Sequence, residues 1–408
     1  MTKALIATIL VFLLIAMSPE TAALAYTVGT TIPAAGGCPQ PNHWSLSLAS
    51  PLSRRWSTSL PTTTFPVILT VAAQGTAAQL NEIEQAVSDS FGMWTGVTGT
   101  TFNTVANPGL VAPLTRVSNA NSCTNDAESN VDGIDTICFN QSSMGFTSGV
   151  LAFTRVITAA APGATVGSSP PAAFAGQILD SDTLLRNDGQ ATFATPGALG
   201  TAQGQGAYDL ESILAHELGH WFGLAHSAVW RAMMFPFSPP PGQFLGVRPT
   251  AQAPDGPLGD DDRTGIRVLY PDPNDAVNIG TIQGKILPAN AFAFAEIPAS
   301  STGSAVTGIF GAHVVAVDAA TGSVIAGTLG GWSCNAANPP TQFDGTFSLE
   351  RLPVGHSYQI YAEPIIGLVG PGDFGDALDN LCSTTAAPTC TTPNVNTNFN
   401  VRIRPSGP

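Results

Sequence analysis

The stretch HELGHWFGLAHS, residues 216–227, constrains this chain more than any other feature of its sequence. It holds three of the chain's six histidines, at His216, His220 and His226. Apolar side chains recur before and through it at close to a 3.6-residue period, which predicts a helix with one wide buried face. His216 and His220 are four residues apart, so both imidazoles leave the same face of that helix one turn apart. Asp209 is placed to cap its N-terminus.

The remaining residues of the stretch complete a candidate metal site. Two imidazole nitrogens at this separation suit one tetrahedral zinc ion. Gly223 lets the chain leave the helix through a positive φ and fold back, so that His226 can supply a third nitrogen. Glu217 need not be a ligand, and it is placed to hold and deprotonate a water molecule at the metal. Three protein ligands leave the fourth position open, which is the arrangement of a catalytic zinc site.

Two simpler interpretations compete with a catalytic site. An amphipathic helix with surface histidines would explain a bare H-E-x-x-H, but the full H-E-x-x-H-x-x-G-x-x-H pattern fixes five positions and argues against chance. An inactive relative would keep the ligands, but the intact Glu217 argues for activity.

The stretch HELGHWFGLAHS followed by AMMFP, residues 232–236, resembles the metzincin zinc proteases and, within them, the matrixins. That resemblance implies a methionine-containing turn beneath the three histidines. Met234 follows His226 at the matrixin spacing and is the expected turn methionine. Met233 is the alternative, and ordinary core packing is the simpler interpretation of both. Phe235 replaces the usual tyrosine and, having no oxygen, cannot be a metal ligand of the kind seen in astacins.

The resemblance extends over roughly residues 60–272. It implies an α+β fold, namely an α/β/α catalytic domain with a mixed, twisted sheet and an active-site helix. Residues 77–102 resemble its first helix, and residues 148–157 and 176–187 resemble two of its strands. Residues 132–141 and 148–157 are rich in branched and aromatic residues, which by itself predicts strands. The run 148–157 resembles the edge strand that pairs with substrate. The backbone around Leu151 and Ala152 would therefore bind a peptide by strand addition.

Two acidic pairs carry further expectations. Asp261 and Asp262 lie in a segment that resembles the last matrixin helix, where such a pair braces the active-site floor and the N-terminal segment. Capping of a solvated helix start is the alternative role. Calcium is common in the family, and Asp180 and Asp182 are candidate ligands, although two aspartates are too few to define a calcium site.

The beginning of the chain predicts export. Lys3, an apolar run at 4–17 and an Ala-x-Ala site at 23–25 form the pattern of a secretory signal peptide, with cleavage expected after Ala25. An uncleaved anchor is the alternative, but the run is shorter than the roughly 20 residues that a membrane span needs. The net charge of −14, with only two lysines, argues against nucleic-acid binding. We expect a soluble extracellular monomer that acts on a protein or peptide.

Six cysteines in an exported chain predict disulfides. Cys123 and Cys138 flank a short polar loop and are the first expected pair. Three cysteines lie in each half, which requires either one bridge between the halves or two free thiols. Cys334–Cys382 is the pair expected in the second half. Many matrixins block their zinc with a pro-segment cysteine, and Cys38 is a candidate for that role, although its neighbours do not match the family's motif. A structural disulfide and a free thiol are its alternatives.

After residue 273 the pattern changes to short alternating strands separated by turn signals such as Asp-Gly, which predicts an all-β antiparallel sandwich. Residues 311–364 resemble transthyretin-like, carboxypeptidase-regulatory modules, a match that supports a fold and not an activity. The expected organisation is a signal peptide (1–25), an N-terminal segment that is a candidate short pro-region (26–60), the protease domain (61–272), the sandwich (273–370) and a C-terminal strand with a loose tail (371–408).

The function expected from the sequence is a secreted zinc endopeptidase with Glu217 as general base. The alternative is an exported, non-catalytic binding protein with a relic protease fold. A zinc hydrolase of non-peptide substrates is a third interpretation, against which the candidate edge strand weighs. The other three histidines, His43, His313 and His356, are scattered, and we interpret them as ordinary surface or packed residues.

Overall fold

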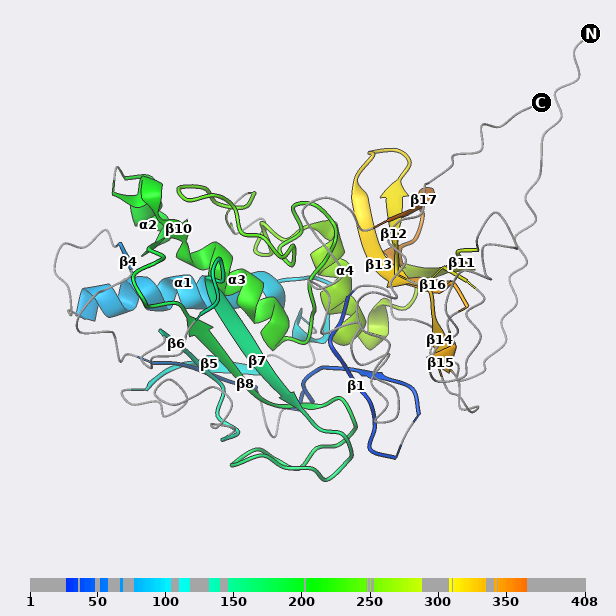
Figure 1. Cartoon of the computed structure of the whole chain (residues 1–408), viewed down its shortest axis with the longest axis horizontal. Helices are drawn as coiled ribbons and strands as arrows, with labels where there is room; N and C mark the ends of the chain where they lie inside the picture. The colour runs from blue at the N-terminus through cyan, green and yellow to red at the C-terminus, as the bar shows by residue number, and fades with distance from the viewer. Residues whose placement is uncertain are drawn as a thin grey trace, which may run out of the picture.

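Two units follow one another along the chain, a mixed helix and sheet unit and a smaller all-β unit (Figure 1). The computed structural model describes residues 27–35, 37–47, 52–57, 67–68, 77–103, 110–117, 132–139, 146–201, 203–246, 248, 250, 253–287, 308–309, 311–334, 341–342 and 344–364. The expected signal peptide and C-terminal tail lie outside these ranges. Within them, no helix combines the length and the apolar character needed to cross a bilayer.

A five-stranded sheet forms the base of the first unit. Its strands, in spatial order, are β5 (Val111–Val117), β3 (Leu52–Ser57), β6 (Thr136–Phe139), β8 (Ile178–Leu185) and β7 (Ala152–Thr158). The first four run parallel, and β7 pairs antiparallel with β8 at the edge. Every residue of β8 is buried, as expected of a strand covered on both faces. The mixed sheet expected from the family resemblance is therefore present.

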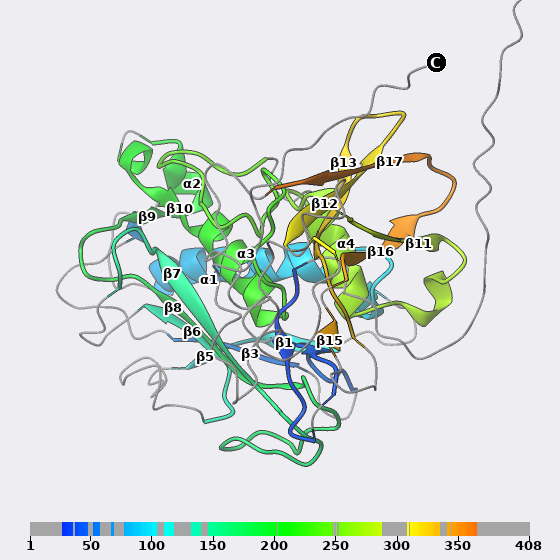
Figure 2. The ribbon, with the colours of Figure 1, turned by 45° about the vertical axis from the view of Figure 1, so that its right-hand side comes forward.

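Two long helices, α1 (Ala77–Thr95) and α3 (Leu210–Trp221), pack against one another over this sheet. The Trp94 indole of α1 donates to the Ala215 carbonyl of α3 at 2.8 Å, and the Ser90 hydroxyl reaches the neighbouring turn. Figures 1 and 2 place both helices on the same face of the sheet. In the part of the chain that the structure describes, α1 and α3 thus form one helical layer on the sheet.

Shorter elements fill the connections. They are β1 (Thr30–Thr31), β2 (Gln40–Pro41), β4 (Val67–Ile68), η1 (Thr101–Asn103), β9 (Phe193–Ala194), α2 (Pro196–Leu199), η3 (Gly204–Gly206), β10 (Tyr208–Asp209) and η4 (Pro273–Asp275). Strands β10, β9 and β4 form a small parallel sheet, and β1 pairs antiparallel with β2.

The N-terminal segment is built into the first unit. Val28 and Trp44 are buried in its core, and the Trp44 indole donates to the Trp221 carbonyl at 2.8 Å. Strand β3 also lies within residues 26–60, yet it pairs with β5 and β6 inside the sheet. These contacts join the candidate pro-region to the core of the protease unit.

The second unit contains two small antiparallel sheets. One pairs β11 (Ile279–Lys285) with β16 (Thr346–Pro353), and the other has the order β13 (Val324–Gly330), β12 (Ala312–Asp318), β17 (Tyr358–Glu363). A separate short pair joins β14 (Ser333–Cys334) to β15 (Thr341–Gln342). Side chains of both sheets, including Val314 and Leu349, share one core. The strands predicted after residue 273 are therefore present.

Helix α4 (Asp260–Leu269) connects the two units (Figure 2). It contacts β13 and β16, and Val268 packs against the core of the second unit. The Thr264 hydroxyl donates to the Ile325 carbonyl at 3.3 Å. The β unit is consequently docked on the last helix of the protease unit.

A disulfide between Cys38 and Cys334 joins the N-terminal segment to the β unit, with 5.6 Å between the Cα atoms. The predicted Cys334–Cys382 pair is therefore wrong, and the alternative of one bridge between the halves is correct. Because the Cys38 sulfur is already bonded, it does not block the metal site. Cys138 is disulfide-bonded. Cys123 lies outside the described residues, so that pairing stays a prediction.

Candidate metal centre

Helix α3 begins and ends where its sequence predicts. The Asp209 carboxylate caps it by accepting from the Ser212 N–H at 2.7 Å. Gly223 follows the last turn with φ +104°, a conformation that side chains disfavour. A Cβ there would also lie 1.9 Å from the Asn42 carbonyl oxygen. Glycine is therefore required both by the turn and by the N-terminal segment that crosses it.

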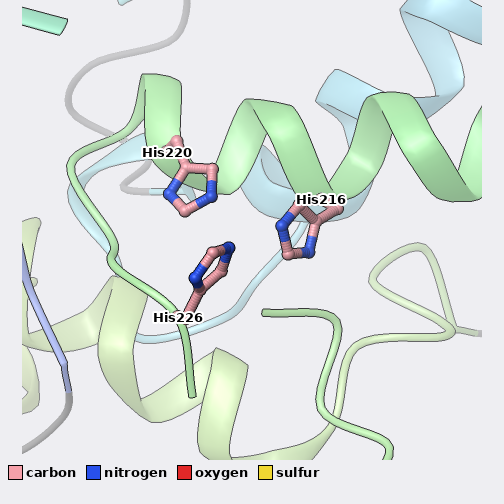
Figure 3. A group of neighbouring side chains, drawn as sticks. All are labelled: His216, His220 and His226. Carbon is pink, nitrogen blue, oxygen red and sulfur yellow. The ribbon is translucent and has the colours of Figure 1, made fainter. Parts of the chain in front are cut away.

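Three histidines meet beyond this turn (Figure 3). His216 and His220 project from α3, and His226 faces them from the returning chain. Their ring centroids are 4.8–5.2 Å apart, and one ring nitrogen from each lies within 4.8 Å of the others. Three nitrogens at these separations fit one zinc ion.

Backbone carbonyls orient two of the three rings. Nδ1 of His216 donates to the Met233 carbonyl, and Nδ1 of His220 donates to the Leu224 carbonyl, both at 2.8 Å. Because a carbonyl can only accept, the proton of each neutral ring sits on Nδ1 and leaves a lone pair on Nε2. This tautomer is the one that offers Nε2 to a metal.

Burial keeps these rings uncharged. It lowers the pKa of His216 to about 3, with a further lowering from His226 nearby. Burial also lowers the pKa of His220 well below its usual value. Neutral imidazoles are the form that binds metal, so no proton has to leave these two rings at neutral pH.

The turn after His226 supports the helix from below. A Cβ on Gly219, which lies between the two helical histidines, would be 2.1 Å from the Met234 sulfur. Met234 therefore packs directly against the turn of α3 that carries His216 and His220. Met233 is also buried, and its carbonyl orients His216. The sequence did not reveal that second role.

The Asp261–Asp262 pair holds this turn from α4. Asp262 accepts from the N–H groups of Met233 at 2.6 Å and Met234 at 3.1 Å, and also from the first residue before α4. It thus holds the turn that contains Met233 and Met234 and also caps the helix. Asp261 accepts from the Ser227 hydroxyl and the Gly327 N–H, both at 2.6 Å. Its second partner lies in the β unit and not in the N-terminal segment, which differs from the expectation.

Glu217 lies on α3 beside His216 and is only 5% exposed. Burial raises the pKa of its carboxyl to about 7. Its Oε2 accepts from the Thr154 hydroxyl of β7 at 2.9 Å. Thr154 carries no motif, and it is 63 residues from Glu217, so the sequence offered no signal for this contact.

Strand β7, which carries the predicted substrate-binding residues, is the edge of the sheet next to α3. The Leu151 carbonyl already accepts from the Arg186 N–H at 2.9 Å, so Leu151 faces β8. Backbone groups alternate along an antiparallel strand, so those of Ala152 point to the open edge. Of the two predicted residues, Ala152 is the better placed to pair with a peptide.

The candidate calcium ligands lie together on β8 but have a cationic side chain for a partner. The Arg155 guanidinium is 3.3 Å from Asp182 and 3.7 Å from Asp180. Burial raises the pKa of Asp182 to about 8 and that of Asp180 to about 6. Arg155 is thus the cationic partner of both carboxyls within the described residues, and a calcium ion at this place stays a prediction.

The remaining histidines lie apart from the metal-binding group. His43 stacks on Phe174, with ring centroids 4.5 Å apart. His313 bonds to Glu363 and His356 to Asp318, both in the β unit. Their interpretation as packed or surface residues is confirmed within the described residues.

Two comparisons with known proteins bear on this site. Residues 56–271 match the family described as Matrixin (Peptidase_M10). A protein of Glycine max named Metalloendoproteinase 1 is 42% identical over 64 residues, which is 16% of this chain and 17% of that protein. The matched family segment covers the sheet, α1, α3, the three histidines and α4.

Proposed function

The chain belongs to the matrixin family, and we propose that it is a zinc-dependent endopeptidase in which Glu217 is the general base. The observation that carries this proposal is the convergence of three imidazoles with a buried carboxylate on the adjacent residue. Three imidazole ligands would leave one coordination position of a zinc ion for water, and Glu217 would be placed to accept a proton from that water.

The residues divide the chemistry as follows. His216, His220 and His226 hold the ion through one nitrogen each. When bound, zinc supplies a Lewis acid that polarises the scissile carbonyl and acidifies a water molecule. Glu217 accepts the proton of the attacking water and delivers it to the leaving amine nitrogen. Its pKa of about 7 suits both steps, since a group that titrates near the working pH can accept a proton and release it.

Substrate is proposed to lie along the open edge of β7. The backbone N–H and C=O of Ala152 would pair with an extended peptide, which places its scissile bond near α3. The pocket for the residue after the cut is proposed to be shaped by the loop between residues 236 and 258. Arg248 ties that loop to α3 through Glu211, at 3.1 Å.

The β unit and the location of the protein complete the proposal. We propose that the two sheets after residue 273 form a β-sandwich that packs on the protease unit. We also propose that the protein is secreted through the signal peptide at 1–25. A disulfide between distant parts of the chain is compatible with an extracellular protein.

The test is hydrolysis of casein by the wild type and by Glu217→Ala, with bound zinc measured on both. We expect the wild type to cleave, a chelator to stop it, and the variant to keep about one zinc while losing activity by several orders of magnitude. A wild type that holds zinc and cleaves neither casein nor small esters would instead support the non-catalytic binding protein. Cleavage of esters alone would support the hydrolase of non-peptide substrates.

A further inference from the structure

One hydroxyl joins the edge strand to the active-site helix. The Oγ1 atom of Thr154, on β7, lies 2.9 Å from Oε2 of Glu217 and 3.0 Å from the Glu217 carbonyl oxygen. On its other side it lies 2.9 Å from Oγ1 of Thr183, the residue directly opposite on β8. Three elements of the fold therefore meet at this one oxygen.

The direction of these bonds follows from counting protons. The carboxylate and the carbonyl of Glu217 can only accept, whereas each threonine hydroxyl has one proton to donate. Thr154 must use its proton on Glu217, so Thr183 donates to Thr154. The charged Oε2 is the stronger acceptor of the two atoms within reach. Thr183 is fully buried, which holds these two hydrogen bonds in one orientation.

The two oxygens of Glu217 are consequently unequal. Oε2 is bonded to Thr154, while Oε1 has no hydrogen bond to any residue that the structure describes. An anchored oxygen fixes the side-chain torsions, and the other oxygen stays available for the proton of a water molecule.

We propose that Thr154 is a positioning residue for the general base, holding Glu217 through Oε2, with Thr183 as its support. This inference rests on the proposed endopeptidase function. Thr154 also follows Ala152 by two residues, so its backbone faces the same open edge. The residue that orients the base thus belongs to the strand proposed to hold the substrate.

A purely structural threonine would fill the same space between β7 and α3. Valine has nearly the same shape and strand preference but no hydroxyl, so Thr154→Val separates the two roles. Thr154→Ser keeps the hydroxyl and loses a methyl group. Thr158→Val is the matched control, because Thr158 lies on the same strand and its hydroxyl contacts that of Thr31 instead of Glu217.

The experiment measures kcat and KM for a peptide, and bound zinc, on the wild type and these three variants. We expect Thr154→Val to lower kcat about tenfold to a hundredfold, the usual effect of losing a hydrogen bond to a charged group. KM should change less than about threefold, because the hydroxyl does not touch substrate. Thr154→Ser should recover most of kcat, and Thr158→Val should match the wild type.

A second readout needs no metal and no catalysis. Carboxyl-labelled glutamate gives a ¹³C resonance for Glu217 in the metal-free protein, assigned by its loss in Glu217→Gln. We expect Thr154→Val to shift this resonance, Thr183→Val to shift it less, and Thr154→Ser to leave it close to the wild-type position.

The outcomes separate this inference from the function it rests on. The positioning role alone is overturned if Glu217→Ala is inactive while Thr154→Val keeps the wild-type kcat and the wild-type position of the Glu217 resonance. Equal losses in the valine and serine variants also overturn it, because the hydroxyl would then not be the cause. A wild type with no Glu217-dependent cleavage overturns both. If Thr154→Val does not fold, Thr183→Val and Thr154→Ser decide by the same two readouts.

Discussion

At the scale of single residues, two imidazoles have the tautomer and the neutral state that metal binding requires, even without a metal ion. Their Nδ1 protons are committed to the Met233 and Leu224 carbonyls, and burial keeps the rings of His216 and His220 neutral. A buried ring that resists protonation lowers the free energy of unfolding in acid, because the unfolded chain takes up the proton freely. The same feature that suits the site to zinc therefore makes the metal-free protein sensitive to acid.

We predict this sensitivity for His216. Its pKa is about 3 when folded and about 6.5 when unfolded, so between those values the unfolded chain binds the extra proton. Its contribution to the free energy of unfolding is complete above pH 6.5 and declines as the pH falls towards 3, by at most about 1.4 kcal/mol per pH unit. Denaturant unfolding of metal-free wild type and His216→Gln between pH 5 and 7.5 measures this. The difference in the free energy of unfolding between the wild type and His216→Gln should narrow as the pH falls. A difference that stays constant with pH would contradict the lowered pKa of His216.

At the scale of elements, the metal site depends on a turn that has no regular structure of its own. The segment after His226 is held by α4 below it and by α3 above it. Asp262 bonds to two N–H groups of the turn, and the Met234 sulfur fills the space beside Gly219. A change in α4 is therefore expected to reach the ligands through the Met233 carbonyl, which orients His216.

Asp262→Ala should test this coupling. It removes the acceptor of three backbone N–H groups and leaves them buried, which we expect to cost roughly 3–5 kcal/mol of unfolding free energy. It should also weaken zinc retention, measured by competition with a chelator. Asp260→Ala is the matched control on the same turn of α4. Its carboxylate is 45% exposed and, among the described residues, pairs with Arg263, so the loss should cost less than about 1 kcal/mol. Equal losses of unfolding free energy and zinc retention in the two variants would mean that Asp262 supports the start of α4 and not the turn after His226.

At the scale of the whole molecule, both ends of the described chain meet the loop that carries His226. The N-terminal segment bonds to the residue before His226, since the Ala225 N–H donates to the Thr27 carbonyl at 2.7 Å. The β unit reaches the residue after it, through Asp261 and the Ser227 hydroxyl. The Cys38–Cys334 disulfide ties these two supports together. The loop that carries His226 is thus held between a segment before the expected protease domain (61–272) and a unit after it in the sequence.

We predict that removing this disulfide weakens the protein without activating it. The double variant Cys38→Ser, Cys334→Ser should lose about 2–5 kcal/mol of unfolding free energy, because the cross-link closes a loop of 296 residues. Activity on casein at 25 °C should stay equal to the wild type or fall. A rise in activity would contradict this prediction and would support the alternative in which Cys38 blocks the zinc.

The sequence alone determined the parts of this protein that depend on neighbours along the chain. His216 and His220 lie on one face because they are one helical turn apart. Asp209 caps the helix through its carboxylate, and the chain leaves the helix at Gly223 because glycine can adopt a positive φ. Strands β6 and β7 follow from their branched and aromatic residues, and the strands after residue 273 follow from local alternation. Each of these features is decided within about ten residues, so a linear pattern is sufficient to predict it.

Only the tertiary structure decided which distant side chains meet. Cys38 pairs with Cys334 across 296 residues, Asp261 turns to the β unit, and Thr154 reaches Glu217 across 63 residues. Both long helices lie on one face of the sheet because α1 bonds to α3, which no local pattern states. Contacts of this kind depend on how whole elements pack, and many sequences with the same local preferences would pair differently. The three histidines that converge could therefore be found from the sequence, whereas the residues that hold and orient them required the fold.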